Sequence, residues 1–379
     1  METYVCGDCI DDYAVKQFIK QQAEELSCDY CQQRAEDNPI AAAIADVGDF
    51  MREGIEKEWS HPEDEAVAWD SEDGRYVVST ADSYDLVDRY LVLESEQLRN
   101  DLADQLGDND WCQKNPYRLT REESWIFDWE RFCQQLKHET RYVFFRVENE
   151  RDEYSEGVQN PHEIMDEIAN IISEIDLIRT IPTGTIIRRA RPHHENEHYS
   201  TVEDLGPPPT ELAIHPNRMS PSGIPMFYGS DTETTALREV EQTGFATVAQ
   251  FVTQRPFKVL DLTRMPDVPS IFDPQPSYER APLTFLHNFL DDLTKRVVKD
   301  GREHIEYIPT QVITEYFRHV FLDHEQERLK GIIYPSARSE SGVSYVLFFK
   351  NDDCIQDDRG IVSDRWLSMQ TRSVRTLRV

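Results

Sequence analysis

The chain has 379 residues, a formal net charge of −32 and a hydrophobic fraction of 39%. At roughly 100–200 residues per domain, this length predicts two or three domains, and the apolar content excludes a chain that is disordered throughout. The negative charge repels a phosphate backbone, so nucleic acid is not an expected partner.

The beginning of the chain carries no targeting pattern. Met1 is not followed by a basic region and an apolar stretch, and no apolar run approaches the ~20 residues of a membrane span. We therefore expect a soluble, cytoplasmic protein that does not bind a membrane. Structural disulfides are not expected in that compartment.

Four cysteines near the start form two closely spaced pairs, Cys6 with Cys9 and Cys28 with Cys31. Each CxxC turn can place two thiolates on one ion, and two such turns complete a tetrahedral four-sulfur site that suits Zn²⁺. A site closed by four thiolates has no open coordination position, so the zinc is expected to be structural. Residues 1–38 are predicted to form this zinc-binding module, and two unrelated cysteine pairs are the alternative.

Residues 39–178 are predicted to be mostly helical. Ser83 is expected to cap a helix that runs to Gly107, and the capping-box sequence that begins at Thr120 opens another helix. The second helix has an apolar face made of Trp125, Trp129, Phe132 and Leu136. A third helix is expected to start at Asn160-Pro161, with an apolar row of Ile164, Ile168, Ile171 and Ile175.

The pattern changes after Pro182, where short strands alternate with helices. Strands are predicted at 185–187, 226–228, 245–252, 259–262, 331–334 and 343–349, and helices at 234–241, 282–298 and 310–321. This mixture indicates an α+β or α/β domain over residues 179–355. The arginine-rich residues 356–379 are interpreted as a solvated basic tail.

Two short motifs suggest other chemistry. The HExxH sequence from His194 to His198 would bind zinc only on a helix, and Pro192 with the charged surroundings predicts a polar loop instead. Arg131 and His138 match the loose Arg–His spacing of HEPN-type ribonucleases. Because they lie on a helix whose apolar face is a core stripe, we favour a structural role for that helix.

Three stretches of the C-terminal half combine residue types suited to one ligand: 187–191, 218–240 and 331–338. Arginines recognise pyrophosphate oxygens, a tyrosine offers a flat face to a heteroaromatic ring, and a lone carboxylate can stabilise a developing sugar cation. Neither GxGxxG nor GxxxxGK occurs. The pattern by itself predicts a site for an anionic aromatic ligand, although Arg191 and Arg238 taken singly are typical surface charges.

In this order, the three stretches resemble the RES domain, which is named for Arg, Glu and Ser. The resemblance implies a fold similar to that of ADP-ribosyltransferases and cleavage of the nicotinamide–ribose bond of NAD⁺ by hydrolysis or phosphorolysis. Characterised members of the family are toxins of toxin–antitoxin pairs. The cysteine pairs and the helices after them resemble the HEPN-like region attached to some RES domains.

The resemblance also implies roles for particular residues. The catalytic set would be Arg189, Tyr228, Glu239 and Ser336, and the residues that bind NAD⁺ would be Arg189, Arg218, Tyr228 and Ser336. Arg188 stands where the family usually has an aromatic residue. The sequence therefore leaves open which of Arg188, Arg189 and Arg191 faces the ligand.

Several alternatives remain at this stage. The same chemistry would allow ADP-ribosyl transfer to a macromolecule, and Arg131 with His138 would allow RNA cleavage. A non-catalytic interaction protein is a third alternative. The acceptor, a cognate antitoxin or other regulatory protein, and a homo-oligomer are all left open by the sequence.

Overall fold

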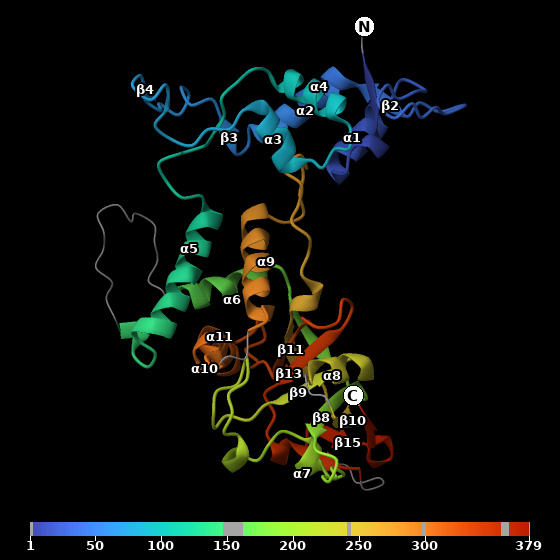
Figure 1. The fold of residues 1–379 in the computed structure, drawn as a ribbon, viewed down its shortest axis with the longest axis vertical. Coiled ribbons are helices and arrows are strands. Elements are labelled where there is room, and N and C mark those ends of the chain that lie inside the picture. The colour runs from blue at the N-terminus through green and yellow to red at the C-terminus, as the bar shows by residue number, and fades with distance from the viewer. Residues whose placement is uncertain (1–2, 147–161, 241–243, 298–300, 358–363, 379) are drawn as a thin grey trace. The chain divides into compact units, whose positions relative to one another are not determined.

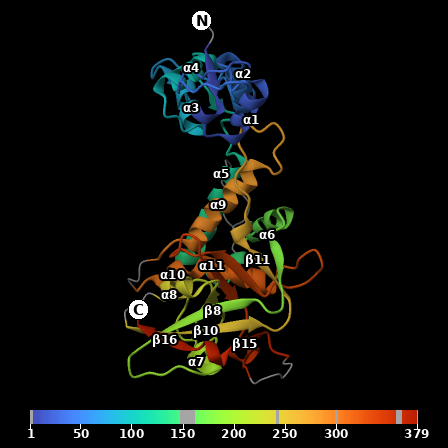
Figure 2. The same ribbon diagram turned by 90° about the vertical axis from the view of Figure 1, so that its right-hand side faces the viewer.

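The computed structural model describes residues 3–146, 162–240, 244–297, 301–357 and 364–378. The chain forms two compact units: residues 1–122 with 267–283, and residues 123–266 with 284–379. Figures 1 and 2 show the elements of each unit. None of the helices in these ranges has the length and apolar character needed to cross a membrane.

The first unit is a small helical domain with short strands. Its helices are α1 (Tyr13–Gln22), α2 (Ile44–Ile55), α3 (Ser83–Tyr90) and α4 (Glu96–Leu106). Its strands pair antiparallel: β1 (Tyr4–Cys6) with β2 (Ala41–Ala43), β3 (Trp59–Ser60) with β6 (Cys112–Gln113), and β4 (Trp69–Asp70) with β5 (Arg75–Tyr76). One apolar core joins the helices and includes Phe272 from the later segment 267–283.

The prediction of a single helix from Ser83 to Gly107 is wrong. The chain forms α3 and α4 instead, and each has its own cap. Asp82 rather than Ser83 caps α3, because its side chain accepts a hydrogen bond from the Asp85 amide at 2.8 Å. The Ser83 hydroxyl donates to the Gly107 carbonyl, and Ser95 caps α4. Gly107 ends α4 as expected, with a φ of +89° that favours glycine.

The second unit is built on a ten-stranded mixed sheet with the order β14-β15-β10-β8-β9-β13-β12-β11-β7, and β16 also pairs with β10. The neighbours pair antiparallel except for β14 with β15 and β11 with β12. The strands are β7 (Ile178–Ile181), β8 (Ile186–His193), β9 (Phe227–Ser230), β10 (Phe245–Thr253), β11 (Phe257–Asp261), β12 (Gly331–Pro335), β13 (Val343–Leu347), β14 (Cys354–Gln356), β15 (Leu367–Met369) and β16 (Arg375–Arg378).

Seven helices of the described residues belong wholly or largely to this unit: α5 (Arg121–Gln134), α6 (Ile164–Glu174), α7 (Val202–Leu205), α8 (Glu233–Glu239), α9 (Arg280–Thr294), α10 (Glu303–Glu306) and α11 (Ile308–His319). The predicted apolar face is confirmed, since Trp125, Trp129 and Phe132 of α5 and Leu136 of the π turn that follows it are all buried. Trp129 packs edge-on against Phe289 of α9, with ring centroids 5.0 Å apart. The predicted start of α6 at Asn160 lies outside the described residues.

The interpretation of residues 356–379 as a solvated tail is wrong for its second half. β15 places Leu367 and Met369 in the apolar core, and β16 pairs with the first half of β10. Thr376 is tied to the sheet by a hydrogen bond between its hydroxyl and that of Thr247 at 2.8 Å. β16 reads Arg375-Thr376-Leu377-Arg378, so each face of this strand carries one arginine.

A helical N-terminal region and a C-terminal α/β domain with a large mixed sheet are therefore confirmed. The similarity to the ADP-ribosyltransferase fold stays a prediction. The boundaries placed after residues 38, 178 and 355 also stay predictions. The second compact unit begins at residue 123 and so takes in α5 and α6, which the sequence had grouped with the preceding helices.

Candidate functional site

A cavity of about 510 Å³ opens on the second unit. Its walls come from β8, β9, α8, the ends of β12 and β13, and the segment between Pro208 and Met226. This volume lies within the usual range for small-molecule sites. The strand order explains the position, because β8, β9, β13 and β12 are neighbours in the sheet and α8 contacts β8, β9 and β13.

Three arginines of β8 line this cavity: Arg188, Arg189 and Arg191. Arg188 donates to the carbonyl of Asp231, and Arg191 donates to the carbonyl of Asp204. A carbonyl oxygen satisfies an N–H group without neutralising its charge. The cavity wall is therefore positive, in a chain whose net charge is −32, and favours an anionic ligand.

Arg189 is held by two contacts with β9. Its Nη1 donates to the Tyr228 carbonyl at 2.6 Å, and its guanidinium lies 5.4 Å from the centre of the Phe227 ring. Its Nε is buried and has no hydrogen-bond partner within the described ranges. Burial and the neighbouring charge of Arg191 lower the Arg189 pKa to about 10, so the group stays protonated at neutral pH.

Tyr228 lies on β9 and faces the cavity rather than filling the core. Its hydroxyl exchanges a hydrogen bond with the Ser220 hydroxyl at 3.0 Å and accepts one from the Met219 amide at 3.3 Å. Burial raises the Tyr228 pKa to about 12, so the ring is neutral at physiological pH. Its orientation is set by these bonds, which leaves a flat aromatic surface on the wall.

Glu239 ends α8, a helix that Thr232 caps by accepting a hydrogen bond from the Thr235 amide. Glu239 Oε1 accepts hydrogen bonds from the hydroxyl of Ser336 at 2.5 Å and from that of Ser344 at 3.1 Å. Its other oxygen lies 3.8 Å from Arg338 Nε, and one third of the side chain is exposed. The carboxylate is thus held in one orientation and remains accessible from the cavity.

Ser336 follows β12 and does not line this cavity in the described part of the chain. Its hydroxyl reaches Glu239 and also accepts a hydrogen bond from the Arg338 amide at 3.2 Å. Sequence reasoning gave no role to Ser344 or Arg338, both of which line the cavity. A serine inside the apolar stretch 343–349 was the available signal for Ser344.

Arg218 also lines the cavity. Its Nη1 donates to the Leu293 carbonyl at 2.9 Å, and its guanidinium lies 5.8 Å from the centre of the Tyr307 ring. The structure thus brings four of the predicted residues, Arg189, Arg218, Tyr228 and Glu239, to one cavity. The fifth, Ser336, is linked to the cavity by its hydrogen bond to Glu239.

Comparison with protein families finds two matches that agree with this arrangement. Residues 21–150 match the HEPN/RES N-terminal domain 1, and residues 186–370 match the RES domain. The chain is a RES-domain protein. No curated protein and no solved structure gave a significant match. The RES match contains the whole predicted set from Arg189 to Ser336 and extends through β15.

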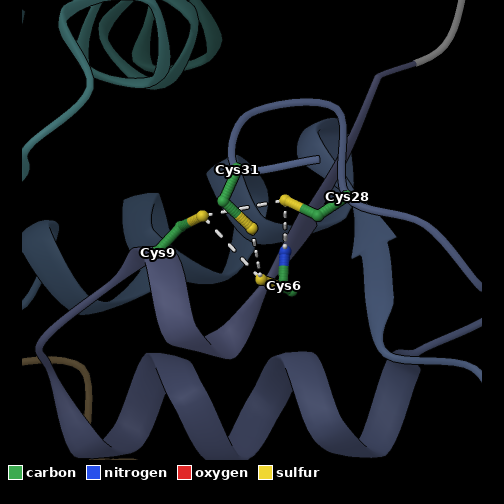
Figure 3. Close-up of side chains that lie close together, drawn as sticks. All are labelled: Cys6, Cys9, Cys28 and Cys31. Carbon is green, nitrogen blue, oxygen red and sulfur yellow. Dashed lines mark hydrogen bonds between the residues drawn. The ribbon is translucent and has the colours of Figure 1, made fainter. Parts of the chain in front are cut away.

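The four paired cysteines of this RES-domain protein converge in the first unit (Figure 3). Neighbouring sulfur atoms are 3.5–3.7 Å apart, and all four lie within 4.8 Å of one another. With Zn–S bonds of about 2.3 Å, the edges of a tetrahedral site are about 3.8 Å long, so these thiolates fit a zinc ion. Disulfides would need about 2.05 Å, and none of these cysteines is bonded to another.

The two other motifs of the RES-domain protein lie in different kinds of local structure. The HExxH sequence forms a turn, with His194 and His198 exposed, and it is not among the candidate metal-binding groups of the described residues. This agrees with the predicted polar loop. Arg131 and His138 lie near the end of α5, where the helix continues as a π turn. Arg131 lies over the Phe127 ring at 5.8 Å.

Proposed function

We propose that the RES domain binds NAD⁺ in the 510 Å³ cavity and cleaves its nicotinamide–ribose bond. The observation that carries this proposal is the carboxylate of Glu239, oriented by two serine hydroxyls on the wall of a cavity that three arginines make positive. The family match supports an enzyme that uses NAD⁺. A fold similar to that of ADP-ribosyltransferases and a role as a toxin or defence effector, restrained by an antitoxin, belong to the same proposal.

Residues from several parts of the cavity wall have roles in this mechanism. Arg189, with Arg218, holds the pyrophosphate, because planar guanidinium groups match its oxygens in pairs. Tyr228 packs on the nicotinamide ring. Glu239 binds ribose hydroxyls and stabilises the positive charge that develops on the ribose as the bond to nicotinamide lengthens.

The electron pair of the broken C–N bond leaves with nicotinamide, which departs as a neutral molecule and needs no general acid. An oxygen of water or phosphate bonds to C1′ and releases a proton to solvent. The products are nicotinamide and either ADP-ribose or ADP-ribose phosphate. The substrate's own positive charge on the nicotinamide ring disappears in the same step.

The test is an NAD⁺ depletion assay on the purified protein, with and without phosphate, in which products are identified by mass. We expect nicotinamide release under at least one condition. ADP-ribose would identify water as the acceptor, and ADP-ribose phosphate would identify phosphate. Stable NAD⁺ under every condition would contradict the proposal, and ADP-ribosyl adducts on added protein or nucleic acid would replace it by group transfer.

Ser336 and Ser344 are positioning residues in this proposal, because their hydroxyls act through Glu239. We expect Ser344→Ala to lower kcat about 10-fold or more, since a hydrogen bond to a charged group contributes about 1.5–3 kcal/mol. KM for NAD⁺ should change much less, and Ser344→Thr should restore part of kcat.

The matched control is Ser368→Ala, which removes the hydroxyl of another buried serine of the same sheet, on β15. We expect that variant to keep its activity. Steady-state kinetics on Ser344→Ala, Ser344→Thr and Ser368→Ala would test the positioning role of Ser344. A Ser344→Ala enzyme with unchanged kcat, or one that loses activity only in proportion to its folded fraction, would contradict a positioning role.

A further inference from the structure

A second cavity, of about 530 Å³, lies next to the proposed NAD⁺ cavity within the second unit. Its walls come from the end of α5 with its π turn, the end of α9, and the residues around α10. The two cavities share Arg218, Arg296, Val297 and Tyr307 as lining residues. A ligand in the second cavity would therefore contact residues that also line the first cavity.

Basic side chains outnumber carboxylates in this second cavity, although the chain as a whole carries 72 acidic and 40 basic residues. The carboxylates that line it belong to Glu130, Asp292 and Glu306. The cavity is therefore a local reversal of the chain's net charge and favours an anion. Its basic lining residues are Lys137, His138, Arg218, Lys295, Arg296 and Arg302.

The carboxylates of the second cavity leave several cations without a counter-charge. Glu306 pairs with Lys137 at 2.7 Å, and the hydrogen bond from Lys137 holds the pKa of Glu306 below its usual range. Asp292 accepts a hydrogen bond from Trp129 Nε1 at 3.0 Å. Where the structure describes the chain, Arg218, Lys295 and Arg296 form no ion pair, and the two arginines donate only to carbonyl oxygens.

We propose that this second cavity binds a small phosphorylated anion other than the substrate, and that this ligand inhibits the NAD⁺ site. Uncompensated arginine and lysine side chains around a cavity of this size suit phosphate groups. A bound phosphate would attract Arg218 and Arg296 and would place negative charge beside the pyrophosphate of NAD⁺. The expected effect is a higher KM for NAD⁺.

Binding can be measured separately from catalysis. Titration calorimetry on the full chain at low ionic strength would use inorganic pyrophosphate in one arm and ADP in the other. We expect Lys295→Glu to weaken binding about 10-fold or more, because it replaces a charge-assisted contact by a repulsive one. Lys295 is exposed and does not line the first cavity. Tighter binding of ADP than of pyrophosphate would identify a nucleotide as the preferred source of the phosphate.

The matched control is Lys350→Glu, which makes the same change at an exposed lysine of the same unit that lines neither cavity. That variant should bind both probes as the wild type does. Equal binding by wild type and Lys295→Glu would overturn the proposal, because the probe would then be bound by the arginines of the first cavity. Absence of binding by the wild type would overturn it as well.

The inhibitory part rests on the proposed function and has its own readout. Pyrophosphate should raise KM for NAD⁺ in the wild type and do so much less in Lys295→Glu. Equal inhibition of the two proteins would contradict the coupling. If the chain does not cleave NAD⁺ at all, the proposed function fails while the calorimetric result keeps its meaning.

Discussion

Replacing Glu239 by Gln should lower the rate of NAD⁺ cleavage by about 10²–10³, because a preorganised charge that meets the transition state commonly contributes about 3–4 kcal/mol. The amide keeps an oxygen that can accept the hydrogen bonds from Ser336 and Ser344, so the side chain should keep its place. What it loses is the negative charge opposite the developing ribose cation. NAD⁺ should still bind, since the arginines are unchanged.

The measurement is single-turnover cleavage of NAD⁺ together with a binding titration. The control is Glu233→Gln, the same substitution on the same helix, at a residue that pairs with Arg375 and does not line the cavity. That variant should cleave NAD⁺ at the wild-type rate. Near wild-type turnover by Glu239→Gln would show that the carboxylate is not part of the reaction.

Loss of the metal should have the largest effect on stability. We expect the purified chain to contain about one zinc ion, held by the four thiolates, and the apparent binding free energy of such structural zinc is about 10–16 kcal/mol in small zinc-binding peptides. We expect the first unit to depend on this ion, because Cys6 ends β1 and packs, with Cys28, against Ala41 of β2. Without the ion, four thiols would crowd together with no bond between them.

Elemental analysis and thermal unfolding of Cys9→Ser would test this, with chelator-treated wild type as a second sample. Both should lose zinc and unfold the first unit at a lower temperature. Cys112→Ser is the matched control, since Cys112 is a buried cysteine of the same unit outside the cluster, and it should keep its zinc. A zinc-free protein with an unchanged unfolding profile would contradict a structural role.

Local patterns in the sequence were sufficient where the chemistry is local. Two CxxC turns predict a four-sulfur group because each turn brings its own two thiols together, and the structure confirms that the four converge. The apolar spacing of α5 predicted its buried face because helical periodicity depends only on neighbours along the chain. The order of the Arg, Tyr, Glu and Ser stretches was enough to indicate the family that the comparisons show.

Tertiary structure decided what depends on residues far apart in the chain. Ser344 approaches Glu239 because β13 lies beside β9 and contacts α8, and no spacing in the sequence encodes that neighbourhood. From the sequence alone, the arginines of β16 indicate a solvated tail, whereas the structure pairs this strand with the distant β10. The sequence determined which chemical groups the protein carries and most of its helices and strands. Local periodicity does not specify how distant strands pair. Their pairing decided that Glu239 is hydrogen-bonded by two serines and that the two cavities share Arg218.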